Sequence, residues 1–218
     1  VNAVNGKEII RSFISGKPGI PAQGVGALAA ALAKRITNIE LGRNINSLNE
    51  LAGPVIVATD VTTAAQLLDM TSVPKLAAST TWYHEVPMEL TSSKCLIIDG
   101  QKRGPVVNSI AISNLAPTYA PAGKALLSST TVDFASESEV RRHLALIWGT
   151  QSSEWSLIAK YEIPKSLPIF APGAQGVTSA KVATNIYVAG DYRSAPSQNG
   201  ALLSGRLAAE ELLFDERS

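Results

Sequence analysis

Apolar residues recur at helical spacing in the two segments that open the chain. In residues 7–15 (KEIIRSFIS), large apolar side chains repeat at this spacing before a glycine, which predicts a short amphipathic helix. Residues 24–36 (GVGALAAALAKRI) are rich in alanine and leucine and end on basic residues, a pattern typical of a stable helix. The proline and glycine residues between the two segments indicate a turn.

Strand-type patterns follow these helices. Short β-type runs at residues 36–41 and 44–48 are separated by a glycine and predict a hairpin. The run PVIVA at residues 54–58 is continuous and apolar, which is typical of a parallel strand buried on both faces. We expect Asp60 or Thr62 to cap the helix that begins after this strand.

The middle of the chain changes in character. Between residues 76 and 132, strand-like runs are separated by Pro, Gly, Asn and Asp, which predicts an antiparallel or mixed sheet. Ser136 and Glu139 form a capping-box pattern at the start of a helix over residues 136–148. We expect the apolar side chains of this helix to be buried and His143 to be solvated.

The pattern after this helix predicts four further elements. They are a strand over residues 155–163, a loop rich in proline and glycine over 164–176, a buried strand over 185–189 (NIYVA), and a helix over 199–214.

Two buried strands, at residues 54–58 and 185–189, therefore bracket a β-rich middle. We predict a mixed α/β fold of the α+β kind with a discontinuous organisation. In this arrangement, residues 61–183 form an inserted domain, and residues 1–60 and 184–218 are two pieces of one other domain.

Composition and charge narrow the class of protein. The chain has 218 residues, of which 45% are apolar and 17% charged, so it is globular rather than disordered. The sequence has 19 basic and 18 acidic residues, so it creates no strong positive electrostatic field that would attract nucleic acid or an anionic membrane. This balance favours a small or neutral ligand.

Cysteine usage and the apolar segments bear on the cellular location of the chain. Cys95 is the single cysteine of the sequence, which excludes an internal disulfide, and we expect a buried thiol. The uncharged stretch of residues 104–123 contains three prolines, so we predict strand and loop rather than a membrane span. No secretory signal opens the chain, and a cytoplasmic location is expected.

Two glycine-containing motifs are candidates for binding chemistry. Residues 24–29 (GVGALA) fit a GxGxxA pattern, but no strand precedes them, so we interpret these glycines as a helix start. In residues 186–209, Gly190 and Asp191 end a buried strand, and Gly200 and Ala201 begin a helix. A strand, a Gly-Asp turn and a small-residue helix form the layout of a cofactor site, in which bare N–H groups at the helix start face the ligand.

The second motif carries a resemblance to a known family. The run AGDYRSAPSQNGALLSGRLAAEELL resembles the C-terminal flavin-binding signature of the FAD-dependent amine oxidase, protoporphyrinogen oxidase and phytoene desaturase superfamily. Other stretches match that family in the same order: PAQGVGALAAALA at residues 21–33, the predicted hairpin at 39–48, VIVATD, and YEIPKSLPIF. The resemblance covers nearly the whole chain.

The resemblance implies a flavin-dependent oxidoreductase with a remnant of a Rossmann-like FAD-binding domain and an inserted β-rich substrate domain. It also implies FAD contacts at six positions: Ile45 at the adenine, Gly190 and Asp191 at the ribityl or pyrophosphate part, and Asn199, Gly200 and Ala201 at the flavin pyrimidine edge. On this basis, Gly200→Val is expected to abolish flavin binding at little cost to the fold.

The family's opening GxGxxG turn and its ribose-binding glutamate are absent from this sequence. The chain therefore resembles the C-terminal portion of such an enzyme. We expect the parent protein to bind FAD and a small apolar or amine substrate. The chain alone is expected to hold no FAD, to be inactive, and to form homo-oligomers through surface that the missing half would cover.

Catalytic residues do not emerge from the sequence, and no metal-ligand spacing occurs. Four side chains are candidates for the substrate cavity: Trp82, His84, Lys160 and Tyr161. Trp82 and His84 share one face of a predicted strand, a pattern that core residues also produce. The alternative function is a non-catalytic ligand-binding or interaction module that keeps the inserted domain without a working flavin site.

Overall fold

The computed structural model describes residues 6–7, 10–11, 15, 19–171 and 177–217. The chain divides into two units. Unit 1 comprises Val1–Gly16, Glu40–Ala77 and Leu167–Ser218, and unit 2 comprises Lys17–Ile39 and Ala78–Ser166. The helix predicted over residues 7–15 and the end of the loop predicted over 164–176 fall largely outside the described residues.

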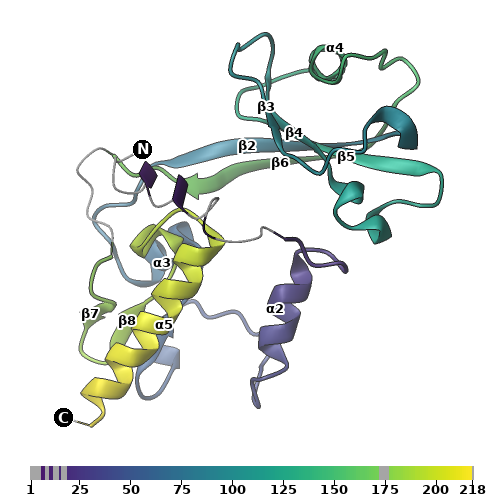
Figure 1. Cartoon of the computed structure of the whole chain (residues 1–218). Coiled ribbons are helices and arrows are strands. Elements are labelled where there is room, and N and C mark those ends of the chain that lie inside the picture. The colour runs from purple at the N-terminus through teal and green to yellow at the C-terminus, as the bar shows by residue number, and fades with distance from the viewer. Residues whose placement is uncertain (1–5, 8–9, 12–14, 16–18, 172–176, 218) are drawn as a thin grey trace. The chain divides into compact units, whose positions relative to one another are not determined.

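Unit 1 contains a three-stranded sheet in the order β1 (Val55–Val57), β8 (Ile186–Val188) and β7 (Lys181–Ala183) (Figure 1). β1 and β8 pair in parallel, with Val55 opposite Ile186, and β7 pairs antiparallel with β8. The two continuous apolar runs of the sequence are therefore neighbouring parallel strands, as their composition predicts.

Both faces of the β1–β8 pair are covered by apolar side chains. On one face, Val57 and Val188 pack with Ala64 of α3 (Val61–Leu67). On the other, Ala189 packs with Ala208 of α5 (Gln198–Asp215). This two-sided burial explains why the strands carry no alternation of polar and apolar residues.

Local signals set the helix boundaries of unit 1. Asp60 caps α3 by accepting hydrogen bonds from the amides of Thr62 (2.9 Å) and Thr63 (3.2 Å). The hydroxyl of Thr63 also donates to Asp60, and this bond makes the largest contribution to lowering the pKa of the Asp60 carboxyl. The prediction of Asp60 as a cap is confirmed.

Polar contacts fix the C-terminal half of α5 to the sheet. Glu211 accepts hydrogen bonds from the amides of Ala180 (2.6 Å) and Lys181 (3.3 Å). Asp215 accepts bonds from Lys181 Nζ (2.6 Å) and the Tyr187 hydroxyl (2.5 Å). The Asp215 bond is the main reason why the pKa of Tyr187 rises to about 12.

The hairpin predicted over residues 36–48 is wrong. No strand forms there, and Ser47 instead opens a short 3-10 helix, η1 (Leu48–Glu50), with a full capping box closed by Glu50. This local hydrogen bonding competes with strand pairing for the backbone amides. Ile39 and Leu41 remain exposed. The helix of residues 24–36 does form, as α2 (Gly26–Ala33).

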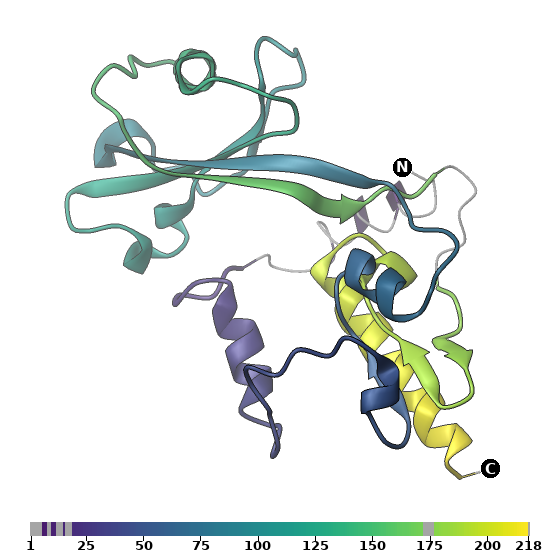
Figure 2. The same ribbon diagram turned by 180° about the vertical axis from the view of Figure 1, so that it is seen from behind.

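Unit 2 is built on a five-stranded sheet in the order β3 (Ile97–Ile98), β4 (Val106–Ala111), β5 (Lys124–Thr131), β2 (Leu76–Pro87) and β6 (Ser156–Pro168). The β3–β4, β4–β5 and β2–β5 pairs are antiparallel, which agrees with the sheet predicted for this region. Figure 2 shows β2 and β6 side by side as the longest strands. The division between the two units falls within both strands.

β6 is longer than predicted. The sequence pattern ended this strand at residue 163 and assigned Pro164 to a loop, but the strand continues to Pro168. β6 is the last strand in the sheet order, so one of its edges lacks a neighbouring strand in the sheet. Proline is tolerated on an edge strand because an outward N–H is not needed for the ladder.

The core of unit 2 lies between the sheet and α4 (Glu137–Trp148). Trp82 of β2 and Leu127 of β5 are buried with Val140 and Leu144 of the helix. The predicted capping box is confirmed, because Ser136 Oγ accepts from the Glu139 amide (3.3 Å) and Glu139 accepts from the Ser136 amide (2.8 Å).

The prediction that His143 is solvated is wrong. Its side chain is 2% exposed and bridges the start of β4 and the loop that precedes it. Nδ1 accepts a hydrogen bond from the Val106 amide (3.0 Å), so the proton sits on Nε2, which donates to Asp99 Oδ2 (2.8 Å). Amides in the turn that follows Asp99, with Arg103 first, lower the pKa of Asp99 to about 2.

Helical spacing explains this burial. Val140, His143, Leu144 and Ile147 repeat at the three- and four-residue steps of one helix face, and all four pack inward to different degrees. The expectation of a solvated His143 followed from the adjacent arginines. The helical spacing of His143 instead indicates the core face.

Stability of unit 2 is expected to fall as the pH drops below about 6.5, the ordinary value for histidine. His84 is fully buried, and this burial lowers its pKa despite the nearby Glu137 carboxylate (Nε2 to Oε1, 3.3 Å). Because the unfolded chain then binds the proton more readily, acidification favours unfolding. Urea midpoints between about pH 7.5 and 5.5 measure the trend, and His84→Leu should flatten it. An unchanged slope in that variant would assign the effect to another group.

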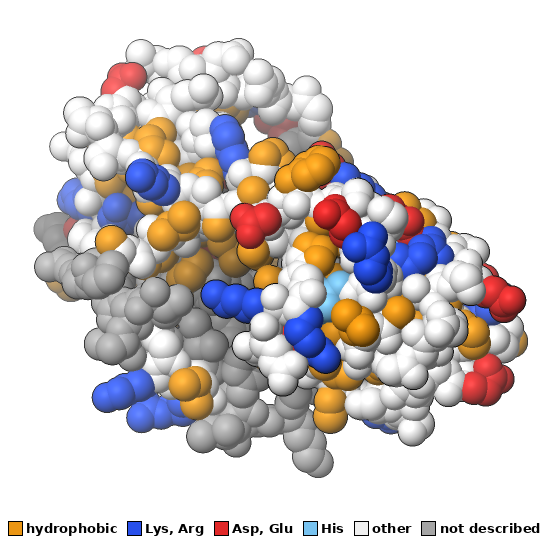
Figure 3. Space-filling model, turned by 90° about the horizontal axis from the view of Figure 1, so that it is seen from above, with side chains coloured by type: hydrophobic (Ala, Val, Ile, Leu, Met, Phe, Trp, Pro, Cys, Tyr) orange, Lys and Arg blue, Asp and Glu red, His pale blue; other side chains and the backbone are white. Residues whose placement is uncertain are grey.

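The surface of the molecule contradicts the expectation for Cys95 and agrees with the balanced charge of the sequence. Cys95 is exposed, which contradicts the predicted buried thiol, because it lies in the irregular segment before β3 rather than in a strand. On the face drawn in Figure 3, acidic and basic side chains are interspersed with apolar ones. Among the described helices, none has both the length and the apolarity needed to cross a membrane.

Candidate functional site

The carboxyl ends of β1 and β8 form the first candidate site. Because the two strands are parallel, the segments that follow them leave the sheet at the same edge. Asp60 follows β1, while Gly190 and Asp191 follow β8. In open α/β sheets, ligands bind outside the carboxyl ends of parallel strands, at this kind of edge.

Gly190 is needed for local packing. A Cβ on this residue would lie 2.2 Å from Cε1 of Tyr192, so the aromatic ring packs directly against this glycine. A contact of Gly190 with the cofactor stays a prediction. The Gly190 amide donates to Ser204 Oγ (3.0 Å) of α5. The Tyr192 hydroxyl donates to the Ala189 carbonyl (3.3 Å), and burial raises the pKa of Tyr192 to about 12.

Asp191 starts a short 3-10 helix, η5 (Asp191–Arg193), directly after the turn. Its side chain is half-buried, and this burial raises the pKa of the carboxyl against the opposing effect of the Tyr192 amide. A carboxylate that is partly removed from water at the end of a parallel strand is suited to accept hydrogen bonds from ligand hydroxyl groups.

The expectation of bare N–H groups on Gly200 and Ala201 is wrong. Ser197 caps α5, and its Oγ accepts from the Gly200 amide (3.0 Å) while its carbonyl accepts from the Ala201 amide (3.0 Å). The first-turn amides of Gln198 and Asn199 are the ones without an acceptor inside the helix. These two donors, with the positive end of the helix dipole, can face an electron-rich group.

Gly200 is also packed rather than open. A Cβ on this residue would lie 2.0 Å from the carbonyl oxygen of Ala195. The expectation that a larger side chain at Gly200 costs the fold little is therefore wrong, because the helix start rests directly on the preceding turn.

The remaining predicted cofactor residues lie in unit 1 with different exposures. Ile45 is half-buried in the irregular segment before η1, whereas Asn199 and Ala201 are exposed. Their contacts with adenine and with the flavin edge stay predictions.

The predicted substrate residues belong to unit 2. Trp82 and His84 are buried under α4, and the Trp82 indole donates to Thr131 Oγ1 (3.1 Å). Lys160 Nζ lies 4.8 Å from the centre of the Trp82 ring, and Tyr161 is exposed. A substrate role for these four residues stays a prediction, and the burial of Trp82 and His84 matches the core pattern that their strand face also allowed.

Sequence reasoning missed Ser197, Ser204 and Tyr192, which hold the site together. A signal was present for Ser197, because a serine three residues before Gly200 is a typical N-cap. Ser204 acts through a hydrogen bond across the β8–α5 junction, which no local pattern reveals. Tyr192 contacts Gly190 and Ala189, which are close in sequence, but its packing against the β1–β8 strands and α3 cannot be read from a local pattern.

The described residues fit one part of a flavin cofactor. Asp191 offers an acceptor for hydroxyl groups, and the first turn of α5 offers two backbone donors. Within the described ranges, carboxylate, imidazole and thiol groups do not gather in threes as a metal site would require.

Comparison with known proteins also points to a flavin-containing family. The sequence matches the family described as flavin containing amine oxidoreductase over residues 19–213. No curated protein matches the chain.

Solved structures share the fold at low sequence identity. A reduced UDP-galactopyranose mutase superposes with a TM-score of 0.66 at 13% identity, over 88% of this chain and 52% of that one. A protein from Exiguobacterium sp. 255-15 assigned as a protoporphyrinogen oxidase gives 0.61 at 15% identity over the same shares. An oxidoreductase from Methanosarcina mazei gives 0.52 at 14% identity, over 72% of this chain and 42% of that one.

The chain thus spans about half the length of these structures. The family match, in contrast, extends over most of the 218 residues and includes the β1–β8 edge, the Gly190–Asp191 turn and nearly all of α5. The sequence resemblance is confirmed, and the chain belongs to the flavin containing amine oxidoreductase family.

Proposed function

We propose that this chain is the C-terminal part of an FAD-dependent oxidoreductase of the amine oxidase and phytoene desaturase type, which oxidises an apolar or amine substrate. One observation carries the proposal: in a chain that matches a flavin family, two parallel strands lead at the same edge into Asp60 and into Gly190–Asp191, and the second turn leads through η5 to the capped helix α5. That layout suits a dinucleotide-type cofactor.

The proposal assigns different tasks to different parts of the chain. Residues 1–60 and 184–218 are the remnant of a Rossmann-like FAD-binding domain, and residues 61–183 are an inserted substrate domain. The parallel pairing of β1 with β8, across the whole predicted insertion, supports the first assignment. The antiparallel sheet and α4 of unit 2 support the second.

The chemistry of oxidation would belong to the flavin, which accepts the electrons of the substrate when bound. The residues of this chain would bind and orient it. Asp191 would accept hydrogen bonds from sugar-type hydroxyls, and the Gln198 and Asn199 amides would donate to an electron-rich ring edge. Gly190, Gly200 and Ser197 would act indirectly, because they hold the turn and the helix start in place.

We expect the 218-residue chain alone to bind no stoichiometric FAD, because the sequence lacks the glycine-rich turn that would hold the pyrophosphate. The product of the complete gene should be yellow and show the two-band flavin absorption. If the complete protein is colourless, this result would overturn the flavin proposal and favour the non-catalytic module. Flavin absorption from the 218-residue chain alone would overturn the expectation that FAD binding needs the glycine-rich turn that this sequence lacks.

A substitution in the complete protein tests the site itself. Asp191→Ala should weaken FAD binding at least about tenfold, because each hydrogen bond to a charged acceptor contributes about 1.5–3 kcal/mol. Asp133→Ala, an exposed carboxylate in unit 2, serves as the control and should leave the affinity unchanged. Equal affinities in the two variants would mean that Asp191 does not face the cofactor.

A further inference from the structure

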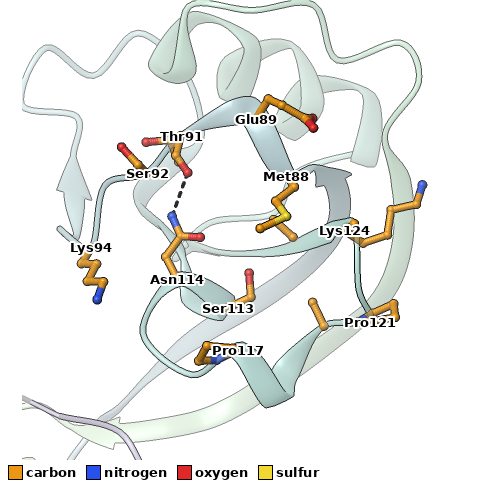
Figure 4. Close-up of a pocket in the computed structure, with 13 residues that line it drawn as sticks. Met88, Glu89, Thr91, Ser92, Lys94, Ser113, Asn114, Pro117, Pro121 and Lys124 are labelled. Atoms are coloured by element: carbon orange, nitrogen blue, oxygen red, sulfur yellow. Dashed lines mark hydrogen bonds between the residues drawn. The ribbon is translucent and has the colours of Figure 1, made fainter.

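Unit 2 contains a cavity of about 520 Å³, which is separate from the β1–β8 edge. One wall comes from η2 (Met88–Leu90) and the segment after it, and the other from η3 (Ile112–Asn114), η4 (Pro117–Tyr119) and the start of β5. Figure 4 shows that the side chains of Met88, Ser113 and Asn114 point into this space.

The amide of Asn114 has a fixed orientation in the cavity wall. Its Nδ2 donates to the carbonyls of Thr91 (2.8 Å) and Ser93 (2.9 Å), so both amide hydrogens are used. The Oδ1 atom must then be the one that faces the cavity, as drawn in Figure 4. Among the described residues, no donor reaches this oxygen.

Ser113 supplies the complementary group beside it. Its Oγ accepts a hydrogen bond from the Leu126 amide (3.0 Å), which leaves the hydroxyl hydrogen free to donate. The residue is 7% exposed, and its hydroxyl points into the cavity. One hydrogen-bond donor and one acceptor thus stand on adjacent residues of η3.

Three charged side chains line the cavity, and Glu89, Lys94 and Lys124 are all exposed to solvent, so the apolar part of the wall favours an uncharged, partly apolar ligand. Met88, Pro117 and Pro121 provide apolar surface, and a methionine side chain adapts to the shape of what it contacts. The ammonium groups of Lys94 and Lys124 point away from the cavity at opposite edges in Figure 4. Lys124 is paired with Glu85 (3.0 Å), so its charge is already satisfied.

We propose that this cavity binds a neutral small molecule that carries an amide group on a short aliphatic body. The ligand N–H would donate to Asn114 Oδ1, and the ligand carbonyl would accept from the Ser113 hydroxyl. The aliphatic body would lie against Met88 and Pro117. This site does not depend on the flavin proposal, because its residues are all in unit 2.

The two methionines of the sequence give a direct readout in the 218-residue chain. Met88 lines the cavity, whereas Met70 lies in unit 1 and serves as an internal reference. With isotope-labelled methionine methyl groups, titration with isocaproamide should shift the Met88 signal and leave that of Met70 in place. A dissociation constant in the millimolar range, which corresponds to a binding free energy of about −4 kcal/mol, is expected for a ligand of this size.

Comparator ligands and variants decide between the alternatives. Isocaproate, with the same body and a carboxylate, should bind at least about tenfold more weakly, and Lys94→Gln should leave amide binding unchanged. Ser113→Ala should weaken amide binding about fivefold or more, with an undisturbed Met88 signal in the free protein as the check on folding. Tighter binding of isocaproate would overturn the proposal, as would a fall in amide binding in Lys94→Gln. Equal shifts of both methionines, or no shift at all, would do the same.

Discussion

Replacing Gly200 with valine should destabilise unit 1 by about 3 kcal/mol, well beyond the cost of helix propensity. A Cβ at this position would lie 2.0 Å from the Ala195 carbonyl oxygen, and backbone atoms cannot move aside as a flexible side chain can. Hydrogen exchange along α5 measures the effect. Tryptophan fluorescence supplies a separate view of unit 2, because all three tryptophans lie there.

The matched control is Gly205→Ala, five residues further along the same helix. A Cβ on Gly205 would meet no atom within 4 Å. Alanine there should leave stability unchanged or raise it by up to about 1 kcal/mol, because it is the better helix former. If Gly200→Ala proved as stable as Gly205→Ala, the helix start could not rest on Ala195 as described.

Replacing His143 with phenylalanine should destabilise unit 2 by about 3 kcal/mol. Phenylalanine keeps an aromatic ring at this position, although a larger one, but the Val106 amide loses its buried acceptor and Asp99 loses a donor. An unsatisfied buried group costs about 1–3 kcal/mol, and a charged one costs more. Urea unfolding followed by tryptophan fluorescence measures the change.

A pair of glycines in the same loop tests the packing of the His143 ring. A Cβ on Gly104 would lie 2.5 Å from Cγ of His143, whereas one on Gly100 would meet nothing within 4 Å. Gly104→Ala should therefore destabilise, by about 2 kcal/mol, and Gly100→Ala should not. In a His143→Ala background, the Gly104→Ala cost should largely vanish. An additive double variant would show that the two residues do not touch.

The elements that the sequence predicted correctly are those specified by neighbouring residues. The continuous apolar runs gave β1 and β8, and their distance in the sequence gave a discontinuous pairing that the structure confirms. Caps at Asp60 and Ser136 placed the starts of α3 and α4. Each of these signals acts within a few residues, so a local pattern is sufficient to read it.

Some errors arose where a distant segment decides the outcome, and others arose where a local signal was overlooked. Pro164 was read as a break because the edge position of β6 cannot be known before the sheet order is known. The amides of Gly200 and Ala201 were taken as free because the local N-cap signal of Ser197, whose hydroxyl and carbonyl accept their hydrogen bonds, was overlooked. The burial of His143 depends on Asp99 and Val106, which come from another part of the chain.

The parallel pairing of β1 with β8 also bears on the order in which the chain folds. Val55 meets Ile186 about 130 residues later, whereas the β4–β5 ladder joins residues only about 20 apart. If Ala78–Ser166 organises first, the loop left to close shortens to about 40 residues, which lowers its entropic cost by about 1 kcal/mol. The backbone bond from the Ile169 amide to the Lys75 carbonyl (2.8 Å) joins the ends of that shortened loop. On this order, the Gly190–Asp191 turn would be assembled late, on a scaffold that the middle of the chain has already formed.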